Sequence, residues 1–211
     1  MPADTRVNIF FLTIKRQPMA PIFVQDLAQR IDQLSLSQPT NVGKGGMKIC
    51  FLKLDGQVVT VKLAPDLETI TAPFEPSVFQ GTGEEERKGI LFNIPQDTFD
   101  AFAAVEEFCR QALAESFPRV QALWSSSLRP SDKYPATLKA KINVSGARAA
   151  KFYNEANEPA EQPENWKHLP CNAVLQVRGC YIQKQGIGML LEVTHLQYGT
   201  EPSAVEEVSP F

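Results

Sequence analysis

The segment from Arg129 to Tyr153 concentrates residue types that bind nucleic acid. It holds six basic residues against one acid, Asp132, so its local charge is +5 in a chain whose formal net charge is −3. The basic residues are Arg129, Lys133, Lys139, Lys141, Arg148 and Lys151. Lysines on one strand face can follow phosphates, and exposed rings can stack on bases. This pattern predicts phosphate contacts from Lys139, Lys141, Arg148 and Lys151, with Phe152 and Tyr153 as stacking rings. The alternative is a solvated strand face whose rings lie in the core.

Other basic and aromatic residues are further candidates for the same surface. They are Lys44, Lys48 and Lys53 around the first hairpin, Arg178 in the last hairpin, and Trp166 beside a polar loop. Scattered surface lysines and a Trp166 that anchors its loop on the barrel are the alternatives. Strict alternation places Tyr181 in the core, unless Gly179 marks a β-bulge.

The last residues of the sequence form a second candidate site. No Lys or Arg follows Lys184, and the sequence closes on an acidic, aromatic-ended segment that contains Glu206, Glu207 and Phe211. A flexible acidic segment with an apolar ring can dock in an apolar pocket that has a basic rim. We therefore expect Glu206, Glu207 and Phe211 to bind a partner protein, and an ordinary frayed terminus is the alternative.

The sequence predicts no catalytic residues, no cofactor and no metal site. His168, Cys171 and Cys180 match no zinc spacing, and no nucleophile or dinucleotide motif is present. Glu84–Glu86 and Glu106–Glu107 are interpreted as solvated acidic runs. Cys50 and Cys109 lie in apolar runs typical of buried thiols. Because the sequence shows neither a signal peptide nor a long apolar stretch, we expect a soluble intracellular protein with no membrane partner.

Short strands and one helix dominate the elements that must position these residues. The expected strands are 7–14, 47–54, 57–63, 89–94, 136–144, 172–183 and 187–198, and the expected helix is about 97–116. Asp55-Gly56 favours a tight hairpin, and Leu138, Ala140 and Ile142 alternate with Lys139 and Lys141. The predicted fold is mainly β, an OB-fold-like β-barrel over residues 1–198 with one inserted α-helix, followed by a disordered acidic tail over residues 199–211.

Several short motifs, in order along the chain, carry a resemblance to a known family. They are Gly45-Gly46, Pro65, Pro73-Phe74, Ile94-Pro95, Trp124, Ser127-Leu128, the stretch from Tyr134 to Lys141, and Gly188-Met189-Leu190-Leu191. The chain resembles the single-stranded-DNA-binding proteins of nucleocytoplasmic large DNA viruses, which are similar to those of podophages. The resemblance implies an OB core with an inserted helix, and sequence-independent binding of single-stranded DNA in replication, recombination and repair.

The resemblance also implies a role for the tail. An acidic, aromatic-ended tail recruits polymerase or helicase in such proteins and can occupy the DNA groove when DNA is absent. The tail here is less acidic than is usual, and Ala136 stands where such proteins often have a second proline.

The sequence therefore predicts a non-enzymatic protein that binds single-stranded DNA at the site of replication. Two alternatives stay open: an OB-like interaction module without nucleic-acid binding, and an RNA-binding protein, because contacts to the 2′-hydroxyl leave no legible motif. The sequence leaves a monomer and a homodimer equally open.

Overall fold

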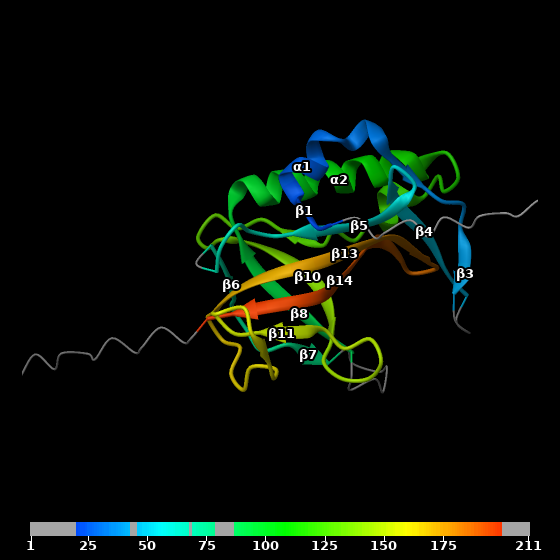
Figure 1. The fold of residues 1–211 in the computed structure, drawn as a ribbon. Helices are drawn as coiled ribbons and strands as arrows, with labels where there is room; N and C mark the ends of the chain where they lie inside the picture. The colour runs from blue at the N-terminus through cyan, green and yellow to red at the C-terminus, as the bar shows by residue number, and fades with distance from the viewer. Residues whose placement is uncertain (1–19, 43–45, 68, 79–86, 200–211) are drawn as a thin grey trace, which may run out of the picture.

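A computed structural model of the 211-residue chain describes residues 20–42, 46–67, 69–78 and 87–199. The predicted strand 7–14, Lys44 and the segment 200–211 therefore lie outside the described residues. The predicted division of the chain at residue 198 stays a prediction for the same reason. The described part is mainly β, as predicted, and Figure 1 shows its strands wrapped into a barrel with two helices packed on one side.

Five strands close the barrel. They are β6 (Ile70–Ala72), β8 (Arg87–Ile94), β10 (Ala136–Asn143), β13 (Leu169–Gln183) and β14 (Gly186–Tyr198). β13 pairs with β6, β6 with β8, and β8 with β10, all antiparallel. β10 pairs with β14 in parallel, and β14 returns to β13 as an antiparallel hairpin. The ring of backbone hydrogen bonds is thus complete, which removes free edges from these strands.

A second hairpin extends the sheet from β13. β4 (Met47–Leu54) and β5 (Gln57–Lys62) both pair antiparallel with β13, and their turn has positive φ at Asp55 and Gly56, as predicted for this dipeptide. Short strands border the main ones. They are β1 (Ile22–Phe23), β2 (Leu34–Leu36), β3 (Thr40–Val42), β7 (Ser77–Val78), β9 (Leu128–Arg129), β11 (Lys151–Tyr153) and β12 (Pro159–Ala160).

One long helix covers the barrel, as predicted. α2 (Gln96–Ala114) begins after Pro95 and buries an apolar stripe at helical spacing that includes Phe102, Val105 and Cys109. The six-residue α1 (Val24–Gln29) lies beside it in Figure 1 and was not expected from the sequence. η1 (Ile31–Gln33) and α3 (Val120–Leu123) are single turns. No helix in the described ranges is long and apolar enough to cross a membrane.

β10 has the alternation that its sequence predicts. Leu138, Ala140 and Ile142 are buried in the barrel, whereas Lys139 is exposed and Lys141 is half-buried on the outer face. The inner residues fill the core, so the lysines must face outward, because successive strand side chains alternate between the two faces of a sheet.

β13 does not alternate strictly, and Gly179 marks one of its two register shifts with β14. The register with β14 shifts between Val177 and Gly179, and Gly179 has a φ of 127° and packs so closely on Cys50 that no side chain would fit. After this bulge Cys180 and Ile182 are buried, whereas Tyr181 is only half-buried and turns outward. The core position that strict alternation gives Tyr181 is therefore wrong, because the bulge inverts the faces.

Candidate nucleic-acid interface

The outer face of β10 lies in the middle of the barrel wall. Lys139 stands opposite Leu91 of β8, and Lys141 lies between Gly89 of β8 and Glu192 of β14. The two lysines are therefore on one side of the molecule, with strands on either side that can supply further contacts.

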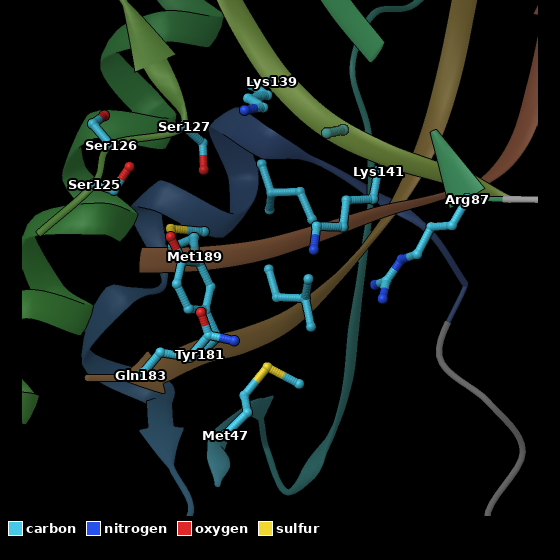
Figure 2. Close-up of a pocket in the computed structure, with 13 residues that line it drawn as sticks. Met47, Arg87, Ser125, Ser126, Ser127, Lys139, Lys141, Tyr181, Gln183 and Met189 are labelled. Atoms are coloured by element: carbon cyan, nitrogen blue, oxygen red, sulfur yellow. The ribbon is translucent and has the colours of Figure 1, made fainter. Parts of the chain in front are cut away.

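A pocket of about 370 Å³ opens on this wall, and we call it the serine-rimmed pocket. Its cations are Arg87, Lys139 and Lys141, and Ser125–Ser127 line its rim. Its other lining residues are Met47, Ala140, Tyr181, Gln183, Met189, Leu190 and Leu191, so none of the lining residues that the structure describes is acidic. Figure 2 shows Lys141, Arg87, Met47 and Tyr181 extending from four different strands toward a common space.

A buried carboxylate of α2 holds the rim of this pocket. Glu106 accepts hydrogen bonds from Ser126 Oγ at 2.6 Å, from the Ser127 backbone N–H at 2.8 Å and from Trp124 Nε1 at 3.4 Å. The interpretation of Glu106 as a solvated residue is therefore wrong. Because a buried carboxylate needs donors, this helix residue and the rim segment stabilise each other.

The rim is also tied to two strands. The Ser125 N–H donates to Ile187 O of β14 at 2.7 Å, and the Lys139 N–H donates to Ser127 O at 2.7 Å. Gly188 allows this close approach, because a Cβ on it would lie 2.5 Å from Ser125 O and 3.0 Å from the Tyr181 hydroxyl. The wall of the pocket is thus fixed by helix, strand and glycine together.

A second depression, which we call the Arg178 groove, continues the wall beyond Glu192. Its cations are Arg148, Lys151 and Arg178, and Glu192 is the one acid among the described residues that line it. Glu192 is buried and accepts from Arg178 Nη1 at 3.0 Å and from Asn143 Nδ2 at 2.6 Å. This carboxylate is therefore already occupied by its neighbours, and it orients Arg178 on the surface.

The two depressions adjoin, because Lys141 of the pocket is the cross-strand partner of Glu192 in the groove. Together they form what we call the basic face. Its cations are Arg87, Lys139, Lys141, Arg148, Lys151 and Arg178. Among the described residues that line the basic face, six cations stand against one carboxylate, which is a local charge of +5 in a molecule of net charge −3.

The predicted stacking rings do not all reach this surface. Phe152 is 8% exposed and Trp166 is 5% exposed, and the two rings pack edge to face with centroids 5.9 Å apart. The expectation that these two rings are exposed for stacking is wrong, because each fills the core that the other helps to form. Trp166 instead anchors its loop, and its backbone N–H donates to Glu75 Oε1 at 2.7 Å.

Tyr153 is half-buried beside the Arg178 groove. Its ring stacks on His195, with centroids 6.0 Å apart and ring planes at 24°. Burial, and then the nearby Lys151 ammonium, lowers the pKa of His195 from its ordinary value of 6.5. The imidazole in this stack is therefore neutral at neutral pH.

The other residues predicted to bind DNA or a partner either lie away from the basic face or fall outside the described residues. Lys48 and Lys53 are exposed on β4 but line neither the serine-rimmed pocket nor the Arg178 groove. Lys44, Glu206, Glu207 and Phe211 lie outside the described residues, so their roles stay predictions.

Sequence reasoning missed Arg87 and the serine rim. Arg87 follows the acidic run Glu84–Glu86 and precedes the expected strand 89–94, although it begins β8 and lies on the opposite face from Ile90 and Phe92. Extending the β8 alternation back by one period would have found Arg87. The rim segment has no such periodic signal, because Glu106 holds it from 20 positions away.

The four cysteines are buried and unpaired, in agreement with the prediction for Cys50 and Cys109. Burial raises the pKa of Cys171 to about 12. The pKa of Cys180 is also raised, first by a hydrogen bond with Cys109 and then by burial. In the described ranges no group of His, Cys, Asp and Glu side chains is arranged to hold a metal ion.

Comparison with known proteins identifies similar folds but no close relative. No protein-family profile matches the sequence, and no curated protein matches it. The chain is similar in structure to single-stranded-DNA-binding proteins of bacteriophages. Gp2.5 of bacteriophage T7, a single-stranded-DNA-binding protein, is 12% identical with a TM-score of 0.49, and the similarity covers 67% of this chain and 86% of gp2.5.

The protein of bacteriophage Enc34 gives two further similarities. Its complex with single-stranded DNA is 13% identical over 78% of this chain and 94% of that one, with a TM-score of 0.40. Its C-terminally truncated form is 14% identical, and the similarity covers 79% of this chain and 95% of that one, with a TM-score of 0.43. At these identities the likeness concerns the fold.

Proposed function

We propose that the basic face binds single-stranded DNA. The observation that carries this proposal is the gathering of six cations on two adjoining depressions, where Glu192, the one carboxylate among the described lining residues, is already hydrogen-bonded. A local positive field of this kind attracts phosphates even when the whole molecule is acidic, because salt screens distant charges. Lys139, Lys141, Arg148 and Lys151 make the phosphate contacts.

The shape of the face favours an unpaired strand. The serine-rimmed pocket and the Arg178 groove are concave, and their linings combine cations with apolar and aromatic side chains. An unpaired strand can turn its bases into such depressions while its phosphates meet the lysines. A duplex presents its bases only through its grooves, which are read by a protruding helix or β-ribbon.

We also propose that the protein binds without catalysis. The described groups on the basic face are mostly cations, hydroxyls and apolar side chains, which suit binding, and the carboxylate of Glu192 is engaged by Arg178 and Asn143. The raised pKa values of Cys171 and Cys180 keep these thiols protonated at neutral pH, whereas a cysteine nucleophile needs the thiolate.

On the sequence resemblance alone, we extend the proposal to replication, recombination and repair. In this extension Glu206, Glu207 and Phe211 recruit replication proteins. Removal of residues 199–211 should then abolish capture of a polymerase or helicase while DNA affinity is kept or raised. A collapse of DNA affinity would contradict the docking role.

The test of DNA binding is a fluorescence-anisotropy titration of labelled oligo-dT at several salt concentrations. With roughly four phosphate contacts, the logarithm of the association constant should fall with the logarithm of salt concentration with a slope of about −3. A duplex of the same length should bind more weakly. Absence of binding, or binding that salt does not weaken, would reject the proposal. If the corresponding RNA of the same length bound more tightly than oligo-dT, the preferred ligand would be RNA and not DNA.

A further inference from the structure

We propose that the serine-rimmed pocket is a subsite that accepts one base of the bound strand. This inference rests on the proposed function and adds to it a fixed contact with a base, beyond contacts with phosphates. The pocket's 370 Å³ lies at the low end of the range of about 300–1,000 Å³ for sites that hold small organic ligands. A single nucleotide therefore suits it better than a larger ligand.

The lining has the chemistry of a nucleotide site. Met47, Leu190 and the Tyr181 ring offer apolar surfaces to the two faces of a base. Ser125 and Gln183 offer donors and acceptors to its edge, because a hydroxyl and an amide can each both donate and accept.

The cations of the pocket lie where a backbone would pass. Lys139 and Lys141 come from the outer face of β10, and Arg87 comes from the neighbouring β8, so all three stand on one wall. In Figure 2 the serine rim lies beside Lys139 and across the space from Lys141 and Arg87. A strand crossing β10 can thus keep its phosphates on the lysines while one base points into the pocket.

Hydrogen bonds within the protein fix the rim of the pocket, and such preorganisation lowers the entropic cost of binding. Three hydrogen bonds from the 124–127 segment converge on Glu106 of α2, and two further backbone bonds tie the segment to β14 and β10. Such a rim cannot collapse onto Tyr181 without breaking these bonds.

Tyr181 is free to respond to a ligand. Within the described residues, no hydrogen bond is made by its hydroxyl, which lies near Gly188 at the pocket wall. The bulge at Gly179 is what turns this ring outward from the core. The bulge thus interrupts the regular pairing of β13 with β14 and places an aromatic ring in the pocket.

The pocket can be observed directly by methyl NMR of protein labelled at its four methionines. Met47 and Met189 line the pocket, whereas Met1 and Met19 lie outside the described residues. Saturating oligo-dT should shift the methyl signals of Met47 and Met189. An oligodeoxynucleotide of the same length that lacks all bases should bind with a similar salt slope and leave both signals near their unbound positions.

Two outcomes overturn the subsite while the proposed function stands. In one, oligo-dT binds in the anisotropy titration but shifts neither Met47 nor Met189. In the other, the abasic strand shifts both signals as much as oligo-dT does. If oligo-dT does not bind at all, the proposed function itself fails.

Variants give a second, quantitative test. Tyr181→Ala removes the ring, and Gly188→Ala pushes the rim away because its Cβ would lie 2.5 Å from Ser125 O. Each should lower the ratio of affinities for oligo-dT and the abasic strand by about 5- to 100-fold, the range for one stacked base. The control Tyr198→Ala removes a ring whose hydroxyl donates to Glu161 O, outside the pocket, and should keep the wild-type ratio. If the ratio of affinities for oligo-dT and the abasic strand were the same in Tyr181→Ala, Gly188→Ala and Tyr198→Ala, the subsite would be contradicted.

Discussion

β10 and β4 are both eight-residue strands that carry two lysines, yet only the lysines of β10 line the basic face. Lys139 and Lys141 are two residues apart and share one side of the strand. Lys48 and Lys53 are five apart, so regular alternation sends them to opposite sides. The number of residues between two lysines therefore decides whether a strand can present them together.

The neighbours of the two strands differ as well. Lys141 lies across from Glu192, whose partner Arg178 adds another cation, and Asn143 lies across from Arg87. The cross-strand partner of Lys48 on β3 is Asn41, and the partners of Lys53 are Ser35 and Val58. A strand becomes part of a binding surface through its neighbours as much as through its own residues.

Charge reversal on the two strands tests this difference and should have the largest effect. Lys139→Glu with Lys141→Glu removes two attractions to phosphate and adds two repulsions, each of roughly 0.5–1 kcal/mol at an exposed position. Affinity for oligo-dT should fall by about 30- to 1,000-fold in an anisotropy titration. Lys48→Glu with Lys53→Glu changes the net charge equally and should lower affinity only a few-fold. Equal losses would show that net charge alone governs binding.

The anchor of the rim beside β10 should have the next largest effect. Glu106→Ala leaves the donors of Trp124, Ser126 and Ser127 without their acceptor, and should lower the free energy of unfolding by about 2–3 kcal/mol. For a domain of this size that is a fall in melting temperature of about 5–10 °C, measurable by calorimetry. Its neighbour Glu107 bonds only Arg110 and Gln111 on the surface of α2, so Glu107→Ala should change stability by less than about 0.5 kcal/mol. A similar loss in both variants would contradict the role of Glu106.

An exposed ring near the start of β10 should have a smaller effect. Tyr134 is 76% exposed two residues before the strand, close enough to extend the path of a bound strand. Tyr134→Ala should weaken oligo-dT binding by about 1 kcal/mol, or roughly fivefold, through lost stacking. Phe74 is 61% exposed but follows β6, so Phe74→Ala is the matched control and should leave affinity unchanged. If Tyr134→Ala and Phe74→Ala changed the affinity for oligo-dT equally, Tyr134 would not contact the bound strand.

The smallest effect concerns pH and His195. The pKa of His195 is lowered in the folded protein, so below pH 6.5 the unfolded chain binds the proton more readily and stability falls as pH falls. Protonation also adds a positive charge to the Arg178 groove, so affinity for oligo-dT should rise a few-fold over the same range. His195→Gln should flatten both dependences, measured by thermal unfolding and anisotropy between about pH 5 and 8. If His195→Gln kept the wild-type pH dependence of stability and of oligo-dT affinity, other titratable groups would be responsible for both.

Local patterns predicted β10, the β4–β5 hairpin and α2, because alternation, Asp55-Gly56 and helical spacing are each contained within one element. The same reasoning placed Lys139 and Lys141 correctly on an outer face. The mainly β barrel also follows from the number and spacing of such strands.

Burial of the rings could not be predicted, because it depends on residues that are distant in sequence. Phe152 and Trp166 bury each other across an intervening loop, and no pattern within either segment indicates that contact. Tyr181 faces outward because of a bulge whose position is set by the packing of Gly179 on β4. Glu106 is buried because the 124–127 segment offers it donors.

The measurement that tests the central claim most directly is protection of lysines from acylation in the wild-type protein, quantified by mass spectrometry with and without saturating oligo-dT. The account predicts that DNA protects Lys139, Lys141 and Lys151 on the basic face, whereas Lys48 and Lys53 on β4 react as they do in the unbound protein. Protection of Lys48 and Lys53 with continued reaction of Lys139, Lys141 and Lys151 would contradict it.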